Sequence, residues 1–398
     1  MINIDYLYNK DAAASFFGKN HFVDRKLHFK IIERGTILPH KHMYINGQWT
    51  WGFGGIVDSR NEFIKSSFVK SNSGAAYTPL EDTVYSGATV VYLGLFYPVW
   101  GHAITDNIRR LWFLKSDVFK SYFKNCPLVY IPWGGGLFTL DRQPNFKRLL
   151  EILELDVNKF QPIYHPMQFE NIILPDESFF VDSGERKFTR EYCETINCIK
   201  NFALKNQTPT SSKKLYYFYG KAQIGEERLA EYFRSKGYEI ISPENLTLDE
   251  QLNLLINCES FASTLGSCAH NSVFLREGTE TIFIPRAANR FTDYQQIIDQ
   301  IANLNSNYVD SSLSIFETFN GPYCFIISEQ LKNFFGDEFD GYSEEDFKIF
   351  LAHVKNSANR GFKQNEEATE YYGEVFQKFL IQIRQRKDLL EAYNVVLG

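Results

Sequence analysis

The chain has 398 residues, which is too long for one ordinary domain and predicts two domains with end segments. Its hydrophobic content of 44% and charged content of 23% are typical of a soluble globular protein, and an aromatic content of 16% predicts large aromatic cores and an aromatic-lined cleft. The net charge of −6, without a long run of Lys or Arg, argues against nucleic acid and anionic lipid as partners.

The first 185 residues are predicted to form one domain that opens with an irregular extension. Glycine-rich and serine-rich stretches at 49–55 and 71–75 are typical of β-hairpins and loops. From residue 84 to 175, β-like runs alternate with helical patterns, which indicates parallel strands joined by crossover helices. The expected strands are 88–93, 127–132 and 171–174, and the expected helices are 101–115 and 145–153.

The helical pattern that begins near residue 101 carries candidate catalytic residues. His102 and Asp106 are four residues apart, so on a helix they share one face, where a carboxylate fixes the tautomer of an imidazole and raises its basicity. Such a pair can take a proton from a hydroxyl. The alternative is a histidine that caps its own helix beside a solvated Asp106. Arg109 and Arg110 are either surface charges or a clamp for an anion or an acceptor in a cleft.

Residues 186–212 are predicted to be a linker, because they are polar, carry charges of both signs and end in Gln-Thr-Pro-Thr-Ser-Ser. A second α/β domain is expected over 213–310. One of its helices ends at Gly237, and the next begins with a capping box at Thr247–Glu250. The expected strands are 214–219, 238–241, 260–264 and 281–284.

Residues 259–286 of this second domain read as a strand, a tight turn at Gly266-Ser267, a short helix and another strand. This order of elements offers backbone N–H groups at a helix N-terminus to a phosphate, so it predicts a nucleotide site. The alternative is a compact loop with no ligand. Four residues on or after the turn are further candidates for the same site: His270, Asn271, Glu277 and Arg286.

Helices are expected at 344–356 and 366–393, and segment 311–398 is predicted to pack back across the first domain. The fold class that the whole pattern predicts is α/β, with two Rossmann-like domains facing a cleft and a C-terminal helical segment. The carboxyl ends of both sheets are expected to face that cleft, where ligands bind.

Taken in order, these segments resemble the family-61 glycosyltransferases, including their bacterial capsule and surface-polysaccharide members. The segment with His102, Asp106 and Leu111 is similar to the family's His-x-x-x-Asp-x-x-x-x-Leu helix. The resemblance extends over residues 85 to 290, which is roughly half of the chain. The later family motifs are matched at Tyr219-Gly-Lys221, Gly225-Glu-Glu-Arg-Leu229, Gly237-Tyr-Glu-Ile240, Leu246-Thr-Leu-Asp-Glu-Gln251 and Leu265-Gly-Ser-Cys-Ala-His-Asn-Ser-Val-Phe274.

Three positions depart from the family pattern. The family's histidine before Gly266 is Leu265 here, its strand-end arginine is Lys221, and an Arg-x-x-x-Asn element has shortened to 222–225. Lys221 supplies a point charge but not a planar fork of donors. His270 is a candidate to replace the lost imidazole, with a packed helix histidine as the alternative, and Arg286 is a candidate to compensate for the lost arginine.

The resemblance implies a GT-B architecture and an inverting transfer, in which a base deprotonates the acceptor hydroxyl as it attacks the anomeric carbon. It implies a nucleotide-sugar donor, expected to be UDP-linked, on the second domain, and a glycan or lipid-linked glycan acceptor on the first. His102 with Asp106 is the expected base. Lys221, Arg286 and the backbone at Gly266–Ser267 are expected to hold the leaving diphosphate.

No cofactor or divalent metal is expected, because the chain has no Asp-x-Asp motif and its six cysteines show neither C-x-x-C spacing nor a Cys/His cluster. Unpaired cysteines, together with the lack of a signal-peptide or transmembrane pattern, predict a cytoplasmic protein. Peripheral association with the inner face of the membrane and a homodimer both stay open.

Two other functions compete with transfer. One is a different cleft enzyme on the same scaffold, such as a sugar-nucleotide epimerase, because a fold does not determine a function. The other is a non-catalytic protein that binds a nucleotide sugar or a glycan, which Leu265 and the shortened element suggest. An epimerase needs no acceptor, and a binding protein consumes no donor. The identity of the sugar, the acceptor and the linkage does not follow from the sequence.

Overall fold

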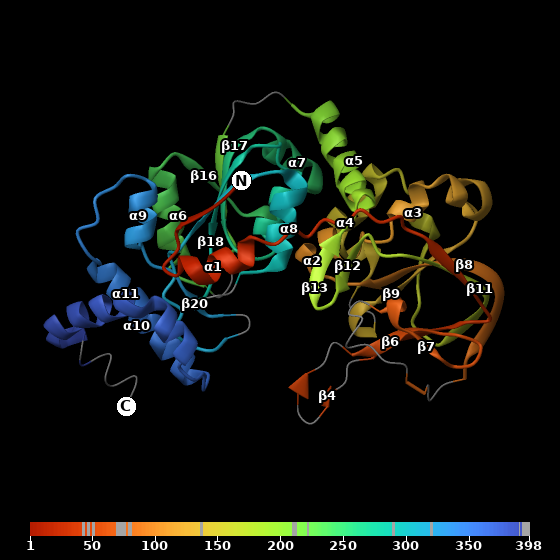
Figure 1. The fold of residues 1–398 in the computed structure, drawn as a ribbon, viewed down its shortest axis with the longest axis horizontal. Helices are drawn as coiled ribbons and strands as arrows, with labels where there is room; N and C mark the ends of the chain where they lie inside the picture. The colour runs from red at the N-terminus through yellow and green to blue at the C-terminus, as the bar shows by residue number, and fades with distance from the viewer. Residues whose placement is uncertain are drawn as a thin grey trace. The chain divides into compact units, whose positions relative to one another are not determined.

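The computed structural model describes residues 1–41, 44–45, 48–49, 52–68, 77–78, 82–135, 138–208, 213–220, 223–288, 291–318, 321–389 and 391. The chain forms two compact units. The central unit consists of His21–Asn206, and the terminal unit combines Met1–Asn20 with Gln207–Gly398. Figure 1 shows the elements of both units along the chain.

The described residues of the central unit include an eight-stranded sheet with the order β10-β9-β8-β11-β3-β6-β7, and β2 also pairs with β11. Neighbours from β10 to β11 are parallel, whereas β2, β3, β6 and β7 pair antiparallel. The strands are β2 (Phe29–Glu33), β3 (Thr36–Lys41), β6 (Phe53–Val57), β7 (Phe63–Ile64), β8 (Val84–Phe96), β9 (Leu128–Pro132), β10 (Phe160–Pro162) and β11 (Met167–Pro175).

Strand β8 is central to this sheet because both of its faces are buried. Residues from Val90 to Phe96 are at most 1% exposed, apart from Gly94 which is also buried, and such a continuous apolar run is typical of a parallel strand covered on both sides. The remaining elements of the unit are the hairpins β4 (Tyr44–Ile45) with β5 (Gln48–Trp49) and β12 (Phe179–Asp182) with β13 (Glu185–Phe188), the helices α2 (Trp100–Thr105), α3 (Trp112–Lys115), α4 (Pro144–Ile152) and α5 (Arg190–Asn206), and the shorter turns η1 (Lys65–Ser67), η2 (Phe119–Phe123), η3 (Trp133–Gly135), η4 (Leu140–Arg142) and η5 (Val157–Lys159).

The terminal unit contains, within its described residues, a six-stranded parallel sheet with the order β1-β19-β18-β17-β14-β16. Its order from β16 to β19 is that of one common class of doubly wound sheet. Its strands are β1 (Ile2–Tyr6), β14 (Lys213–Tyr217), β16 (Tyr238–Ile241), β17 (Cys258–Thr264), β18 (Glu280–Ile284) and β19 (Asn305–Val309), and β15 (Gln223–Ile224) pairs separately with β20 (Tyr323–Cys324).

Helices cover both faces of this sheet (Figure 1). Successive strand residues point to opposite faces, so Ala262 and Ile282 pack with Leu229 and Phe233 of α6 in one core. Thr247 and Glu250 form the capping box of α7 that the sequence predicts. The helices are α1 (Lys10–Phe17), α6 (Glu226–Ser235), α7 (Leu248–Ile256), α8 (Asp293–Ala302), α9 (Glu329–Phe334), α10 (Glu344–Asn359) and α11 (Glu366–Gln385), with turns η6 (Pro243–Asn245) and η7 (Ala269–Phe274).

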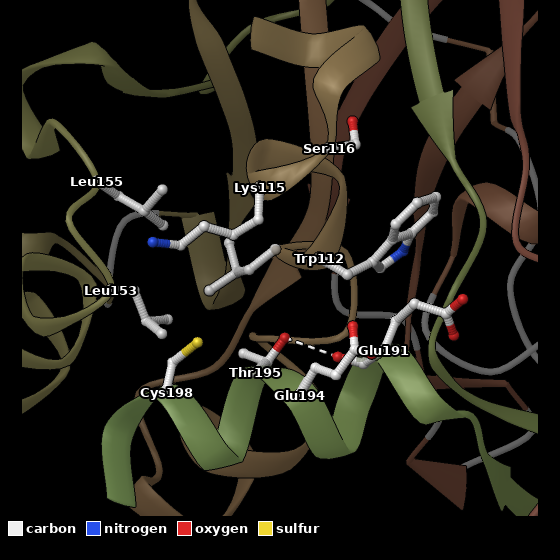
Figure 2. A pocket seen from close by; sticks show the side chains of 10 residues that line it. Trp112, Lys115, Ser116, Leu153, Leu155, Glu191, Glu194, Thr195 and Cys198 are labelled. Carbon is white, nitrogen blue, oxygen red and sulfur yellow. Dashed lines mark hydrogen bonds between the residues drawn. The ribbon is translucent and has the colours of Figure 1, made fainter. Parts of the chain in front are cut away.

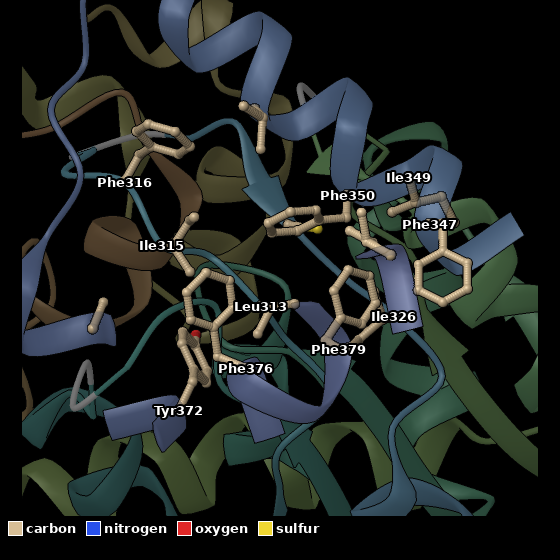
Figure 3. Packing of buried hydrophobic residues seen from close by; sticks show 14 of the residues in the cluster. Leu313, Ile315, Phe316, Ile326, Phe347, Ile349, Phe350, Tyr372, Phe376 and Phe379 are labelled. Carbon is tan, nitrogen blue, oxygen red and sulfur yellow. The ribbon is translucent and has the colours of Figure 1, made fainter. Parts of the chain in front are cut away.

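The two C-terminal helices α10 and α11 enclose a core of their own (Figure 3). Phe350 and Phe379 are both 0% exposed, and their ring centroids lie 4.9 Å apart. This core also includes Leu313 and Ile326, so it belongs to the terminal unit. The apolar faces of these helices are buried within the terminal unit, and the packing of segment 311–398 across the first domain stays a prediction.

The prediction of α/β domains with parallel strands is confirmed, and each expected strand overlaps an observed one. Two boundaries differ. Residues 190–206 form helix α5 within the central unit, where a linker was expected, because Ile196 and Ile199 give this polar segment a buried face. Residues 1–20 belong to the terminal unit rather than the first domain, because β1 pairs with β19. The arrangement of two domains facing a cleft stays a prediction. Within the described residues, no helix combines the length and apolarity needed to span a membrane.

Candidate active site

His102 and Asp106 form a hydrogen-bonded pair directly after the carboxyl end of β8. His102 lies in the short helix α2, and Asp106 caps the end of that helix. His102 Nδ1 is 2.6 Å from Asp106 Oδ2, which also accepts a hydrogen bond of 3.1 Å from Thr105 Oγ1. The imidazole is 28% exposed and the carboxylate 6%. The predicted pairing of the two side chains is confirmed.

The chemistry of the pair follows from its geometry. An ionised carboxylate can only accept, so Nδ1 of His102 is the donor, and in the neutral ring the lone pair is then on Nε2. Burial by itself raises the pKa of Asp106, but the hydrogen bond from His102 and the charges of His102, Arg109 and Arg186 outweigh it and hold the pKa well below its usual range. Asp106 is therefore a permanent carboxylate that orients an imidazole with its basic nitrogen on the opposite edge.

Arg109 and Arg110 lie in the protein interior, so their prediction as surface charges or as a cleft clamp is wrong. Their side chains are 1% and 0% exposed. Both contact Glu177 Oε1, at 3.2 Å from Arg109 Nε and 2.8 Å from Arg110 Nη2. The predicted helix 101–115 is interrupted by turns at 106–111, and both guanidinium groups lie inward, next to β8 at Gly94. A Cβ at Gly94 would lie 2.8 Å from Arg110 Nη1.

A row of aromatic rings adjoins His102. The sequence predicts an aromatic-lined cleft, but it did not single out these rings. The ring of Tyr97 lies 4.8 Å from the ring of His102, that of Trp133 lies 4.7 Å from Tyr97, and that of His40 lies 4.3 Å from Trp133. Tyr97 follows β8 and Trp133 follows β9, so both lie at the edge where parallel strands end. Trp133 directly follows the predicted strand 127–132, which was an available signal, whereas Tyr97 lies four residues past the predicted strand 88–93 and His40 gave no signal.

A second group of predicted residues lies at the carboxyl ends of β17 and β18 in the terminal unit. Gly266 follows β17 with φ +139°, and Arg286 follows β18. The guanidinium lies against the glycine and 4.6 Å from the ring centroid of Tyr219. Arg286 Nε and Nη2 are buried without a hydrogen-bond partner in the described part of the chain. Cationic N–H donors at the carboxyl edge of a parallel sheet are suited to an anion such as a phosphate.

The turn between Gly266 and η7 differs from the predicted helix N-terminus. Residues 269–274 form a 3₁₀ helix, and the backbone N–H groups of His270 and Asn271 donate to the carbonyls of Gly266 and Cys268. The Asn271 side chain is buried and donates to Cys268 O at 3.1 Å, so it stabilises the turn. The role of Asn271 as a ligand contact stays a prediction. Ser267 and the His270 side chain are half-buried beside the turn.

Two further predictions have different outcomes. Glu277 precedes β18, so it lies at the amino end of the strands, where its carboxylate contacts Asn303. Its predicted place beside Gly266 is wrong, because a residue before a parallel strand and one after its neighbour lie at opposite edges of the sheet. Lys221 lies outside the described residues.

Glu226 is a buried carboxylate at this second site that the sequence did not single out as functional. It accepts hydrogen bonds from the N–H groups of Tyr219 and Gly220, at 3.2 and 3.1 Å, and from Thr264 Oγ1 at 3.2 Å. Burial raises its pKa, although these donors and the charge of Arg286 lower it. Glu226 thus joins the segment after β14 to the end of β17.

A cavity of about 330 Å³ in the central unit contains none of the predicted site residues (Figure 2). It lies beside α5, where Thr195 Oγ1 donates to Glu191 O at 2.9 Å. In the part of the chain that the structure describes, no group of three or more His, Cys, Asp or Glu side chains is placed to hold a metal ion. The cavity is lined by Leu111, Trp112, Lys115, Ser116, Leu153, Leu155, Glu191, Glu194, Thr195 and Cys198.

Comparison with known proteins covers the segment with His102 and Asp106 and the segment with Gly266. No curated protein matches the chain. The family model described as glycosyltransferase 61 matches residues 100–282, a range that begins just before His102 and ends within β18. Residues 100–282 are therefore similar to the glycosyltransferase 61 family.

Proposed function

We propose that the protein is an inverting glycosyltransferase that moves a sugar from a UDP-linked donor to a hydroxyl of a glycan or lipid-linked glycan acceptor. The observation that carries the proposal is the contact of 2.6 Å between His102 and Asp106, which gives a chain similar to a glycosyltransferase family an oriented base. We place the reaction in bacterial surface-polysaccharide synthesis, in the cytoplasm and at the inner face of the membrane.

His102 Nε2 takes the proton of the acceptor hydroxyl as its oxygen attacks the anomeric carbon of the donor. The bond from that carbon to the diphosphate breaks as the new glycosidic bond forms, and attack opposite to the leaving group inverts the configuration. Asp106 stabilises the imidazolium that results, because its carboxylate already holds Nδ1–H. The acceptor therefore binds to the central unit.

The donor binds to the terminal unit at the carboxyl ends of β17 and β18. Arg286 Nε and Nη2 are the donors for the diphosphate, and Gly266 allows the guanidinium to lie flat against the backbone. Ser267, His270 and Lys221 are further candidates for this contact. The positive charges of Arg286 and Lys221 compensate the charge of the leaving diphosphate, so we expect transfer to proceed without a divalent metal.

A thermal-shift panel tests the donor assignment. The protein is melted with UDP, GDP, CMP and their sugar conjugates, with and without Mn²⁺, because a ligand of the folded state raises the Tm. A shift with the uridine compounds alone, independent of Mn²⁺ and lost in Arg286→Gln, is the expected result. The matched control is Arg276→Gln, an exposed arginine before β18. The absence of a shift with every nucleotide would contradict the proposal.

A further inference from the structure

Asp106 by itself does not fix the imidazole of His102. A single hydrogen bond at Nδ1 defines the distance from one ring atom to the carboxylate, but the ring can still turn about that contact. The ring of Tyr97 covers one face of the imidazole, with centroids 4.8 Å apart and planes inclined by 33°. An edge contact and a face contact together define both the position and the plane of the ring.

Asn107 holds Tyr97 in place through its backbone. Its Oδ1 accepts from Tyr97 N at 2.9 Å, and its Nδ2 donates to Tyr97 O at 3.1 Å. Asn107 is 0% exposed, and it follows Asp106 directly in the chain. Asp106 therefore holds the edge of the imidazole, and the next residue, Asn107, holds the tyrosine that covers its face.

Trp133 supports Tyr97 from β9. The indole lies 4.7 Å from the phenol ring, and His40 lies 4.3 Å from the indole with planes inclined by 25°. His40 Nδ1 accepts a hydrogen bond of 3.2 Å from the backbone N–H of Gly134, which ties the far ring to the segment that carries Trp133. Tyr97 is thus restrained at its backbone by Asn107 and at its ring by Trp133.

We propose that Tyr97 and Asn107 are positioning residues, which hold the His102 imidazole in the one plane that directs Nε2 to the acceptor hydroxyl. This inference rests on the proposed function for its catalytic meaning. The structural part of the inference does not depend on the substrate. Without the ring of Tyr97, or without the two hydrogen bonds from the Asn107 side chain to the Tyr97 backbone, the hydrogen bond between His102 and Asp106 becomes transient. Misplacement of a reacting group by about 1 Å costs on the order of 100-fold in rate.

The experiment follows the ring N–H proton of His102 by NMR on protein with ¹⁵N-labelled histidine, assigned by its loss in His102→Gln. A hydrogen-bonded ring proton exchanges slowly with water and gives a resolved signal. The variants are Tyr97→Leu, which removes the ring, and Asn107→Asp, which replaces a donor with an acceptor opposite Tyr97 O. The matched control is Tyr97→Phe, which keeps the ring.

We expect the signal in wild type and Tyr97→Phe, and its broadening or loss in the other two variants at a temperature where melting curves show both folded. Once a donor is known, kcat should fall by about 10- to 100-fold in these two variants while KM for the donor stays within about twofold. If either variant does not fold, the same signal is measured in Trp133→Leu. Trp133 is half-buried, and its ring supports the ring of Tyr97.

An unchanged signal in folded Tyr97→Leu and Asn107→Asp would overturn the inference, since the imidazole would then be held without the ring of Tyr97 or the amide of Asn107. The NMR result is separable from the proposed function. Loss of the signal in a protein that transfers no sugar would support the positioning and refute the transfer. A signal that persists in the variants of an active transferase would refute the positioning and support the transfer.

Discussion

The guanidinium of Arg286 lies so close to Gly266 that a Cβ at the glycine would come within 2.5 Å of Nη2. The two residues follow neighbouring parallel strands, so their contact is a property of the sheet edge rather than of either loop. The ring of Tyr219, after β14, lies 4.6 Å from the guanidinium carbon. Any side chain at Gly266 must therefore displace the arginine.

Gly266→Ala should abolish the Tm rise that a uridine nucleotide produces. The new methyl group pushes Arg286 away from its position, and the backbone at φ +139° adds strain. Gly278→Ala is the matched control, because Gly278 also has a positive φ, +76°, but has open space around its Cβ position. Each variant should lose about 1–2 kcal/mol of stability from the backbone alone. Retained nucleotide binding in Gly266→Ala would separate Arg286 from the donor site.

Asp106→Asn should lower kcat by about 100- to 10,000-fold with little change in KM for the donor. The amide matches the carboxylate in shape but no longer stabilises an imidazolium, and it permits the wrong tautomer of His102. Steady-state kinetics with the donor identified by thermal shift would measure both constants. Asp141→Asn, at an exposed carboxylate, serves as the control. Full activity in Asp106→Asn would refute the assigned base.

The same substitution should change the acid stability of the protein. The pKa of Asp106 is lowered in the folded state, so its contribution to stability is fully present above the ordinary carboxyl pKa near 4 and is lost as the pH falls below that value. The difference in unfolding free energy between wild type and Asp106→Asn should therefore shrink below pH 4. Urea unfolding at pH 3, 4 and 6 would show it, and a constant difference would argue against a lowered pKa of Asp106.

Asp299 should give a pH dependence of the opposite sign. Burial raises its pKa to about 7, although Tyr308 and Gln295 donate hydrogen bonds to the carboxylate at 2.6 and 3.1 Å. The folded state then keeps a proton that the unfolded chain releases, so this contribution to stability declines as the pH rises from about 4 through 7. Asp299→Asn should remove that decline, which urea unfolding at pH 5 and pH 8 would measure. An equal decline in both proteins would contradict a protonated Asp299.

Glu177→Gln should destabilise the protein by about 3–5 kcal/mol, because it leaves two buried arginines without their shared carboxylate. The control is Glu170→Gln, whose exposed carboxylate lies 3.8 Å from Arg34 and should change stability by less than about 1 kcal/mol. Denaturant unfolding measures both. Similar losses in the two variants would mean that Arg109 and Arg110 find other partners.

The strands of both sheets could be predicted from the sequence because their signal is local. Runs such as Val90–Tyr92 and Ile282–Ile284 are apolar, β-branched or aromatic and buried on both faces, so propensity and environment agree. The edge strand β1 could not be placed in the same way. Its partner β19 lies about 300 residues further along the chain, and local pattern contains no information on pairing at that range.

The residues of the candidate site also differ in whether a local or a long-range signal determines their environment. The i, i+4 spacing of His102 and Asp106 predicted their contact, since one helical turn suffices to bring them together. The burial of Arg109 and Arg110 depends on Glu177, a residue from another segment, so their own spacing gave the wrong environment. Glu277 was misplaced for a different reason: its position before a strand already indicated the opposite edge of the sheet.

The pairing of β1 with β19 makes the central unit an insertion within the terminal unit. During synthesis, Ile2–Tyr6 leaves the ribosome long before its partner strand β19. The central unit, His21–Asn206, is contiguous in the sequence and can fold independently of that pairing. Strand β1 can therefore pair only after β19 has emerged. Loop closure over that distance is entropically costly, so the pairing of β1 with β19 depends on the completed sheet rather than on any local element.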